Sequence, residues 1–325
     1  MLLGVDGGGT KTEAVLCDTE GNVIRRVIGG PSSAVGIPFD TVKMNLSQIL
    51  HDVCRMDTDL EGAIDSVYLG ISGCGIPLFR ERYFEYVQEL LGSIPANVGS
   101  DSMNPFYGEC GTSDGIVAIC GTGSSAFAYK NGIIHRVDGH GYLLGDESGG
   151  YRMGQMALNA ALREEDGRGP KTILTQLCRQ KAGKPIMDAL AEINDGGKTV
   201  IASYARCLLE ARERNDGVAV RLMDGIENTM AETIIAAGNF VDAHPKKVVL
   251  CGSIWKADSR FYDRVSAKLG KDFLTVILDT PPVYGAVVKA YTQIYATGVS
   301  GDFKKNFKNT YERGSLHEIH QYAGT

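Results

Sequence analysis

The sequence predicts an α/β protein built from two related domains. The chain has 325 residues, about twice the length of a typical domain. Three short apolar segments separated by glycine-containing turns occur near residues 2–28 and again near residues 115–135. Segments with helical spacing of apolar residues follow each copy. We therefore place the domains at residues 1–113 and 114–325, with the cut in the polar stretch 111–114.

In the first domain, two tight turns separate three apolar segments, which predicts an antiparallel meander. A second strand-like segment and two segments with helical periodicity follow it. The expected strands are residues 2–6, 13–17, 23–28 and 63–71, and the expected helices are residues 40–53 and 79–91.

The second domain begins with the same order of strand, glycine–threonine turn, strand, Asn/Gly turn and strand. The expected strands are residues 115–120, 125–129, 133–135, 247–251 and 273–278, and the expected helices are residues 150–163, 170–180, 187–193, 199–212, 218–240, 260–269 and 283–295. The tail, residues 300–325, is polar without a clear period, and we expect it to pack back on the first domain.

Composition excludes several classes of protein. The 41 glycines follow no collagen period and accompany 43% hydrophobic residues, which excludes a fibre and a disordered chain. The net charge of −6 argues against a nucleic-acid partner, which requires a basic face. No apolar run approaches the roughly 18 residues of a membrane span, and the N-terminus lacks the basic region of a signal peptide. The eight cysteines form no C-x-x-C pair, so we expect a cytoplasmic protein with reduced thiols.

The two glycine–threonine turns, residues 7–12 and 121–124, are suited to phosphate groups. Glycine lets the backbone approach a phosphate, and N–H groups and threonine hydroxyls donate to its oxygens. Residues 192–199 lack the first glycine of a Walker loop. Residues 121–126 resemble a dinucleotide fingerprint but lead into a strand, whereas that motif must open a helix.

We therefore predict that two β-hairpins bind one nucleotide from opposite sides. Asp6 ends the first strand next to the first turn, where it could hold Mg²⁺ through water. A turn-capping role for Asp6 is the alternative. ATP and Mg²⁺ are the expected cofactors.

Four blocks in conserved order resemble the sugar-kinase and actin-like ATPase superfamily, and within it the BadF/BadG/BcrA/BcrD-type branch that includes N-acetylglucosamine kinases. The blocks are residues 4–12, 121–124, 139–151 and 249–253. The resemblance implies two actin-like ATPase (ribonuclease H-like) domains. Each would have a mixed five-stranded sheet with helices, and the nucleotide would lie in the interdomain cleft. It also implies a homodimer.

The same resemblance implies roles for individual residues. Those expected to bind ATP are Gly8, Gly9, Thr10, Lys11, Thr12, Gly121, Thr122, Gly123, Ser124, Gly252 and Ser253. Those expected to bind the sugar are Ser33, Ser72, Asp101, Thr122, Gly123, Asp146 and Glu147. Asp101 matches the family's catalytic aspartate, and phosphoryl transfer to an alcohol needs a carboxylate that orients the hydroxyl and accepts its proton.

For three of these carboxylates a purely structural role is the alternative. Asp101 could cap the helix that begins at Ser102, alone or in addition to catalysis. Asp146 and Glu147 could simply begin the helix after Ser148.

Two departures from the family pattern bear on the substrate. Ser33 stands where relatives carry a sugar-contacting asparagine, and His140 replaces the aromatic residue of the third block. The resemblance therefore implies an ATP-dependent kinase of an amino sugar, most simply N-acetylglucosamine or N-acetylmuramic acid, with the exact sugar open.

Two other functions remain as alternatives. One is an activator ATPase of the benzoyl-CoA reductase or dehydratase type, which couples ATP hydrolysis to electron transfer and binds an iron–sulfur cluster through cysteines. Cys74 and Cys110 are the cysteines near the expected interdomain region. The other is a sugar-sensing regulator, although related regulators carry a DNA-binding segment before the first strand and this chain begins with that strand.

Overall fold

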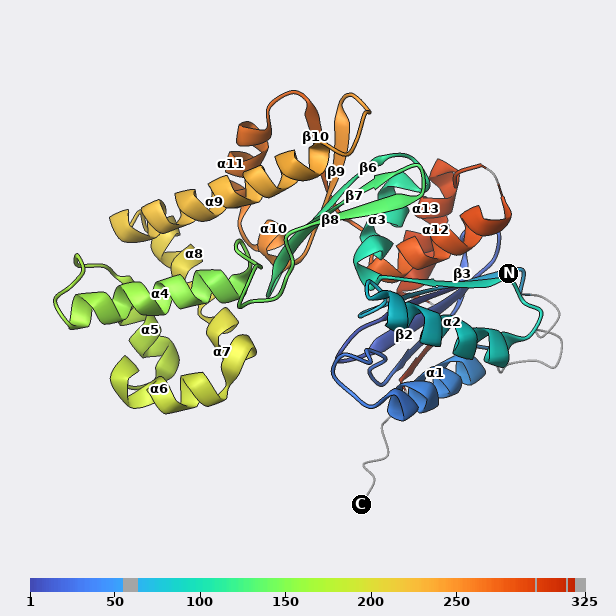
Figure 1. Ribbon diagram of the computed structural model, residues 1–325, viewed down its shortest axis with the longest axis horizontal. Coiled ribbons are helices and arrows are strands. Elements are labelled where there is room, and N and C mark those ends of the chain that lie inside the picture. Colours follow the sequence, from blue (N-terminus) through green and yellow to red (C-terminus); the bar gives the residue numbers. More distant parts are fainter. Residues whose placement is uncertain (55–63, 296, 314, 319–325) are drawn as a thin grey trace, which may run out of the picture. The chain divides into compact units, whose positions relative to one another are not determined.

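The computed structural model describes residues 1–54, 64–295, 297–313 and 315–318 (Figure 1). The chain divides into two compact units. The first comprises Met1–Ser113 with Leu278–Thr325, and the second comprises Asp114–Ile277.

The first unit contains a mixed sheet with the strand order β11-β3-β2-β1-β4-β5. Its strands are β1 (Leu2–Gly7), β2 (Thr12–Cys17), β3 (Val23–Gly29), β4 (Ser66–Ile71), β5 (Ala96–Gly99) and β11 (Ser315–Glu318). β1 pairs antiparallel with β2 and parallel with β4, and β4 pairs parallel with β5. The carboxyl ends of β1, β4 and β5 therefore meet at one edge of the sheet.

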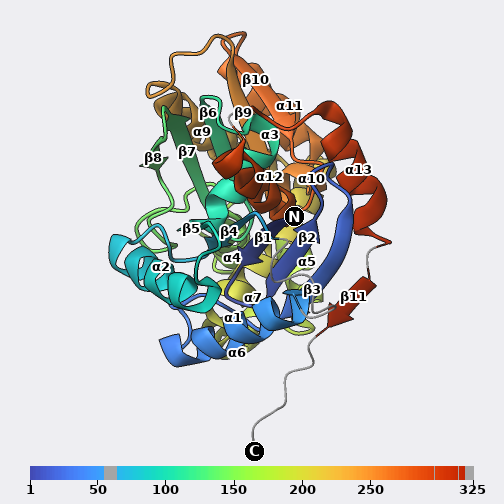
Figure 2. The same ribbon diagram turned by 90° about the vertical axis from the view of Figure 1, so that its right-hand side faces the viewer.

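Helices cover both faces of this sheet (Figure 2). They are α1 (Phe39–Cys54), α2 (Pro77–Leu91), the 3₁₀ helix η1 (Asp101–Met103), α3 (Asn104–Cys110), α12 (Pro282–Ile294) and α13 (Gly301–Tyr311). Side chains alternate along a strand: Leu3 and Val5 pack in one core with residues of α1 and α2. Gly4 faces the other way, where a Cβ would lie 2.5 Å from the backbone nitrogen of Val287 in α12. This close approach fixes α12 against the central strand.

The second unit contains a five-stranded sheet with the order β10-β9-β6-β7-β8. Its strands are β6 (Gly115–Cys120), β7 (Ser124–Lys130), β8 (Ile133–Val137), β9 (Lys246–Cys251) and β10 (Phe273–Ile277). Its helices are α4 (Gly150–Glu165), α5 (Leu174–Ala182), α6 (Ile186–Asp195), α7 (Gly197–Ser203), α8 (Ala205–Glu213), α9 (Gly217–Gly238), α10 (Ser253–Ala257) and α11 (Ser259–Leu269). One buried cluster joins this sheet to its helices.

Two features of the first unit differ from the sequence-based expectations. Residues 278–325, which we assigned to the second domain, belong to the first unit because α12 packs against β1. The first sheet has six strands rather than five because β11 pairs parallel with β3. In the tail, Phe303, Phe307 and Tyr311 bury one face of α13 within the same unit. Residues 319–325 of the predicted tail lie outside the described residues.

Within the described ranges, no helix combines the length and the hydropathy that crossing a membrane would require.

Candidate active site

The first glycine–threonine turn, which we predict to be a phosphate loop, joins β1 to β2, and hydrogen bonds from its own unit hold it in place. The Gly8 N–H donates to the Lys11 carbonyl at 2.9 Å, and the Ser32 N–H donates to the Gly8 carbonyl at 3.0 Å. The Thr12 hydroxyl donates to the buried Ser32 hydroxyl at 2.8 Å, so Thr12 ties the end of the turn to the segment that follows β3. The tip, from Gly9 through Thr10 to Lys11, is exposed. Of the predicted ATP-binding residues in this loop, Thr12 is therefore the one that is fully buried.

Asp6 lies at the carboxyl end of β1 and has a perturbed pKa. Burial is the largest cause and raises the pKa of Asp6 to about 7, and the negative charge of Asp101 adds to the rise. The Asn104 side-chain amide donates to Asp6 Oδ1 at 2.6 Å, which works in the opposite direction. The two carboxylates thus lie close enough to repel each other. The positive charge of Lys11 also acts to lower the pKa of Asp6. Carboxylate oxygens of this kind suit a hard divalent ion such as Mg²⁺.

Asp101 begins η1 directly after β5. Its Oδ1 accepts from the Ser102 N–H at 2.8 Å and more weakly from the Ser100 and Ser102 hydroxyls, at 3.3 and 3.4 Å. Oδ2 has no hydrogen-bond donor among the residues that the structure describes. Burial raises the pKa of Asp101, although these hydrogen bonds oppose the rise. The expected capping role is wrong: η1 begins at Asp101 itself, and Ser100 is its N-cap residue. The second oxygen of Asp101 is left for another partner.

Ser33 and Ser72 lie in the segments that follow β3 and β4 of the first unit. The Ser72 N–H donates to the Gly7 carbonyl at 2.8 Å, which ties the segment after β4 to the end of β1. Ser33 is buried, and a Cβ on Gly73 would lie 4.0 Å from its hydroxyl. The structure therefore brings Ser33 close to the segment that follows β4.

Tyr83 of α2 was missed by the sequence reasoning. Its hydroxyl donates to the Ser32 carbonyl at 2.5 Å and accepts from the Ala34 N–H at 2.8 Å. It therefore clamps the backbone on both sides of Ser33. A tyrosine at a position with the apolar periodicity of a helix looks like an ordinary core residue, so the sequence carried no signal for its hydrogen bonds to the backbone around Ser33.

The second phosphate loop joins β6 to β7 and is tied to the start of α4. The Gly121 N–H donates to the Gly123 carbonyl at 2.9 Å, which closes the turn. The Gly150 and Tyr151 N–H groups donate to the carbonyls of Gly121 and Thr122 at 2.7 and 2.9 Å. The Thr122 side chain is exposed. The loop is thus fixed by a helix N-terminus, with its threonine open to a ligand.

Asp146 lies against this loop. A Cβ on Gly123 would lie 2.5 Å from Asp146 Oδ2, so only glycine leaves room for the carboxylate. Asp146 adopts a left-handed conformation with φ of 55°, which is uncommon outside glycine. Its N–H donates to Asp138 Oδ1 at 3.0 Å, and the Ser124 hydroxyl donates to Asp138 Oδ2 at 3.2 Å. Residues that hold a carboxylate in a strained conformation often belong to functional sites.

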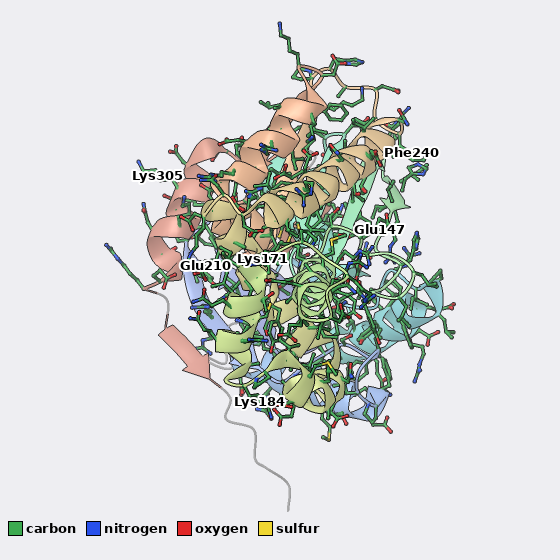
Figure 3. All side chains as sticks on the ribbon, turned by 90° about the vertical axis from the view of Figure 1, so that its left-hand side faces the viewer. Glu147, Lys171, Lys184, Glu210, Phe240 and Lys305 are labelled. Carbon is green, nitrogen blue, oxygen red and sulfur yellow. The ribbon has the colours of Figure 1, made fainter. Side chains whose placement is uncertain are left out.

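Glu147 behaves differently from its neighbour. Its side chain is exposed, and Figure 3 labels it on the surface of the second unit. Since α4 begins at Gly150, neither Asp146 nor Glu147 is inside the helix. The N-cap residue of α4 is Gly149, for which no side-chain cap bond exists.

Lys198 of α7 is a second residue that the sequence reasoning missed. Its Nζ lies 3.0 Å from Asp146 Oδ2. In the structure, residues 192–199 comprise the end of α6, Gly196 and the start of α7. The Gly-Gly-Lys string carried no usable signal, because the contact joins residues that are 52 positions apart.

The predicted adenosine motif follows β9. Gly252 has φ of 114°, and a Cβ there would collide with the carbonyl of Cys120 at the end of β6. Ser253 opens α10 and is exposed. Trp255 is buried and packs against Phe261 with ring centroids 4.8 Å apart, so it belongs to the core.

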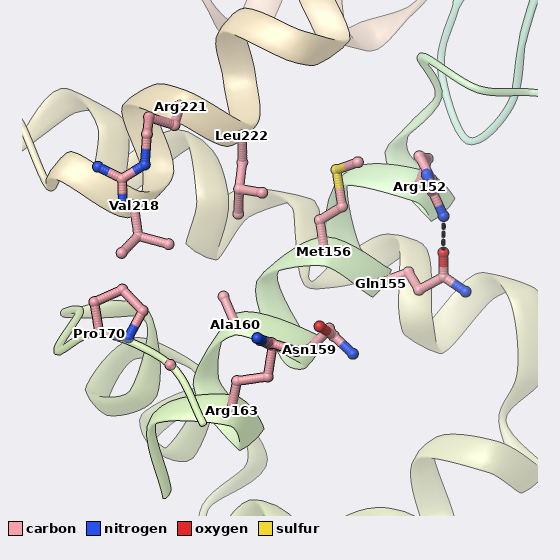
Figure 4. A pocket seen from close by; sticks show the side chains of 11 residues that line it. Arg152, Gln155, Met156, Asn159, Ala160, Arg163, Pro170, Val218, Arg221 and Leu222 are labelled. Atoms are coloured by element: carbon pink, nitrogen blue, oxygen red, sulfur yellow. Dashed lines mark hydrogen bonds between the residues drawn. The ribbon is translucent and has the colours of Figure 1, made fainter. Parts of the chain in front are cut away.

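The second unit also contains an open groove of about 630 Å³ between α4 and α9 (Figure 4). Arg152, Arg163 and Arg221 lie on its walls, and Met156 and Leu222 contribute apolar surface. None of the predicted site residues lines this groove.

The cysteines do not support an iron–sulfur site. Burial raises the pKa of the Cys74 thiol to about 12. Over the part of the chain that the structure describes, no three His, Cys, Asp or Glu side chains are grouped so as to hold a metal ion. The two curated relatives reported below are named as sugar kinases, so the activator-ATPase alternative is not favoured.

The chain matches the BadF/BadG/BcrA/BcrD ATPase family over residues 3–290. It is 33% identical over 191 residues to an N-acetyl-D-glucosamine kinase of Dictyostelium discoideum, in a match that covers 56% of this chain and 60% of that protein. It is 26% identical over 305 residues to an N-acetylmuramic acid/N-acetylglucosamine kinase of Clostridium acetobutylicum, covering 90% and 98% of the two chains.

Among solved structures, a Chromobacterium violaceum protein described as a candidate N-acetylglucosamine kinase superposes with a TM-score of 0.70. The two chains are 24% identical, and the match covers 89% of this chain and 98% of the other. The ROK hexokinase of Thermus thermophilus superposes with a TM-score of 0.58 at 14% identity, covering 91% and 99%. These similarities confirm the predicted actin-like fold of the sugar kinases.

Proposed function

Because the chain belongs to the BadF/BadG/BcrA/BcrD ATPase family, we propose that it is an ATP-dependent kinase of an amino sugar. N-Acetylglucosamine and N-acetylmuramic acid are the substrates named for the two curated relatives. The observation that carries the proposal is the carboxylate of Asp101, which has one oxygen fixed by Ser102 and the other without a donor among the described residues.

Asp101 acts as the general base in this proposal. The sugar hydroxyl approaches Oδ2 and gives up its proton there as its oxygen bonds to the γ-phosphorus of ATP. The bond between that phosphorus and the bridging oxygen breaks, which releases ADP. The raised pKa of Asp101 supports the role, because a base titrating closer to neutral pH accepts a proton more readily.

Asp6 would hold Mg²⁺, directly or through water. The bound ion would neutralise charge on the phosphate oxygens. The fit rests on the partly buried carboxylate at the end of β1, the charge of Asp101 beside it and the neutral donor Asn104. Asn104 is fully buried, so its amide holds Asp6 Oδ1 in a defined orientation.

The two phosphate loops would bind ATP through their N–H groups and threonine hydroxyls, with Gly252 and Ser253 near the nucleoside. Asp146 would accept hydrogen bonds from sugar hydroxyls. Thr122, which is exposed and precedes the Gly123 that contacts Asp146, would also bind the sugar. Ser33 and Ser72 would contact the sugar from the first unit. The homodimer, the cytoplasmic location and the nucleotide site between the domains stay predictions.

A coupled assay of ADP formation tests the function. We expect ADP to form when N-acetylglucosamine or N-acetylmuramic acid is added and little ADP to form without sugar. ATP hydrolysis at the same rate in the presence and absence of every amino sugar would contradict the proposal.

A further inference from the structure

Lys198 is held in place by the packing of α7 against α4. Gly154 of α4 has no side chain, and a Cβ there would collide with the carbonyl of Ile201 in α7. The two helices therefore approach at backbone distance. Since the first residues of α4 are hydrogen-bonded to the second phosphate loop, α7 has a defined position relative to that loop.

The ammonium group of Lys198 has two partners. Its Nζ lies 3.0 Å from Asp146 Oδ2 and 5.6 Å from the centre of the Tyr142 ring. Tyr142 in turn packs edge-on against Tyr151 at the start of α4, with ring centroids 4.9 Å apart. The lysine, the carboxylate and the two rings form a cluster that we call the Lys198 cluster: Tyr142, Asp146, Tyr151 and Lys198.

Stability alone gives a poor reason for a lysine at this position. Lys198 is the second residue of α7, where the helix dipole disfavours a positive charge. A half-exposed ion pair contributes little to folding. The Lys198 side chain is 36% exposed, whereas that of Asp146 is 9% exposed. The ammonium therefore faces the buried carboxylate on one side and solvent on the other.

The charges around Asp146 would repel an anionic ligand without this lysine. Asp138 accepts the Asp146 N–H, and Glu147 is adjacent and exposed, so three carboxylates lie within one loop. The guanidinium of Arg136 donates to the Asp138 carbonyl. An ammonium has three N–H donors, and Asp146 is the only acceptor recorded for Lys198 among the described residues.

We infer that Lys198 is a specificity-determining residue, whose ammonium lets the sugar site accept a substrate that bears a carboxylate. This inference rests on the proposed function. The neutral sugar would use Asp146 alone, and a carboxylate on the sugar would also bind the remaining N–H groups of Lys198. The chemical class of the substrate is thus an amino sugar with an acidic ether substituent, for which N-acetylmuramic acid is the test compound.

The experiment compares kcat/KM for N-acetylmuramic acid and for N-acetylglucosamine in the full-length protein. The variants are Lys198→Met, which removes the charge, and Lys198→Arg, which keeps it. Lys184→Met is the matched control, because Lys184 forms an ion pair with Glu192 in the same unit, and Figure 3 shows it well separated from Glu147. Thermal unfolding of each variant checks the fold.

We expect Lys198→Met to lower the ratio of the two kcat/KM values, acidic sugar over neutral sugar, by about 10-fold or more, as the loss of a charged hydrogen bond implies. Lys198→Arg should keep the ratio within about 3-fold, and Lys184→Met should leave it unchanged. Equal losses for both sugars would overturn the inference, since they would reduce Lys198 to a positioning residue for Asp146. A wild-type protein that phosphorylates only the neutral sugar would also overturn it but would leave the proposed kinase function standing. Turnover of neither sugar would contradict the proposed function itself.

Discussion

The two phosphate-loop regions have the same order of strands and turns but treat their carboxylates differently. In the first unit, Asp6 and Asp101 have neutral hydrogen-bond donors, Asn104 and Ser102, and burial raises the pKa of both. In the second unit, Asp146 has a cation, Lys198, at 3.0 Å. A carboxylate held by neutral donors keeps an oxygen for a metal ion or a proton, whereas an ion pair fixes the orientation of its carboxylate. The comparison agrees with the proposal that Asp6 and Asp101 take part in the chemistry and that Asp146 binds the sugar.

The largest effect is expected for Asp101→Asn. An amide cannot accept the hydroxyl proton, so kcat should fall by about 100- to 10,000-fold. Binding of ATP should remain within about 3-fold, because the phosphate loops are unchanged. Asp40→Asn, an exposed residue in the first turn of α1, is the control. Steady-state kinetics and nucleotide titration measure both quantities, and a variant with wild-type kcat would remove Asp101 from the mechanism.

Asp146→Asn should act mainly on sugar binding. The substitution removes a charged acceptor, so we expect the KM for sugar to rise about 10- to 100-fold while kcat changes less. Kinetics at saturating ATP separate the two parameters. A fall in kcat with an unchanged KM would show that Asp146 acts in catalysis and not in sugar binding.

Gly123→Ala tests the contact between the second loop and Asp146. The new Cβ would lie 2.5 Å from Asp146 Oδ2, and displacing the carboxylate should raise the KM for sugar about 10-fold. Gly121→Ala is a matched control in the same loop, since a Cβ there has no atom within 4 Å. Equal sugar KM values for the two variants would show that Asp146 does not depend on this contact.

Asp6→Asn tests the cost of burying a carboxylate in the first unit. Burial raises the pKa of Asp6 from its ordinary value of 3.8 to about 7 in the folded protein, so folding favours the protonated carboxyl. That contribution to stability is fully present below pH 3.8 and is lost as the pH rises from there through 7. Without nucleotide or metal, the variant should be more stable than the wild type at pH 8 by about 2–4 kcal/mol, at ~1.4 kcal/mol for each pKa unit.

At pH 5 the difference should be roughly half as large or less, because folded wild-type Asp6 is then mostly protonated while the unfolded carboxyl is still mostly ionised, and it should disappear only below about pH 4. Urea unfolding at the two pH values measures the change. A difference independent of pH would mean that Asp6 is not destabilised by burial.

The smallest effect is expected for Tyr83→Phe. The variant leaves the Ser32 carbonyl and the Ala34 N–H without their partner, which should cost about 1–2 kcal/mol and raise the KM for sugar about 3-fold. Tyr86→Phe on the same helix loses a bond to the Lys43 carbonyl and serves as the control. An unchanged KM in Tyr83→Phe would separate the clamp from the sugar site.

Much of the fold could be predicted from local patterns. The meander of the first unit, the repeat of that pattern at β6–β8 and most helices follow from apolar periodicity and glycine-containing turns. The predicted helix 199–212 is interrupted at Tyr204 and forms α7 and α8. α13 was not predicted because its packing depends on contacts with α12, and β11 was not predicted because its pairing partner β3 is distant in sequence.

The candidate site was predictable where the backbone itself forms it. Glycines at 7–9, 121 and 123 marked both loops, Asp6 lies near the end of β1, and Asp101 follows β5. Tyr83 and Lys198 escaped prediction because each acts through a long-range contact between side chain and partner, which no local pattern encodes.

Sugar binding and turnover measured together in Asp101→Asn test the central claim most directly. The account predicts that the variant binds N-acetylglucosamine within about 3-fold of the wild-type affinity by calorimetry and forms sugar phosphate at least about 100-fold more slowly. Turnover at the wild-type rate would contradict the assignment of the chemistry to Asp101 and the first unit.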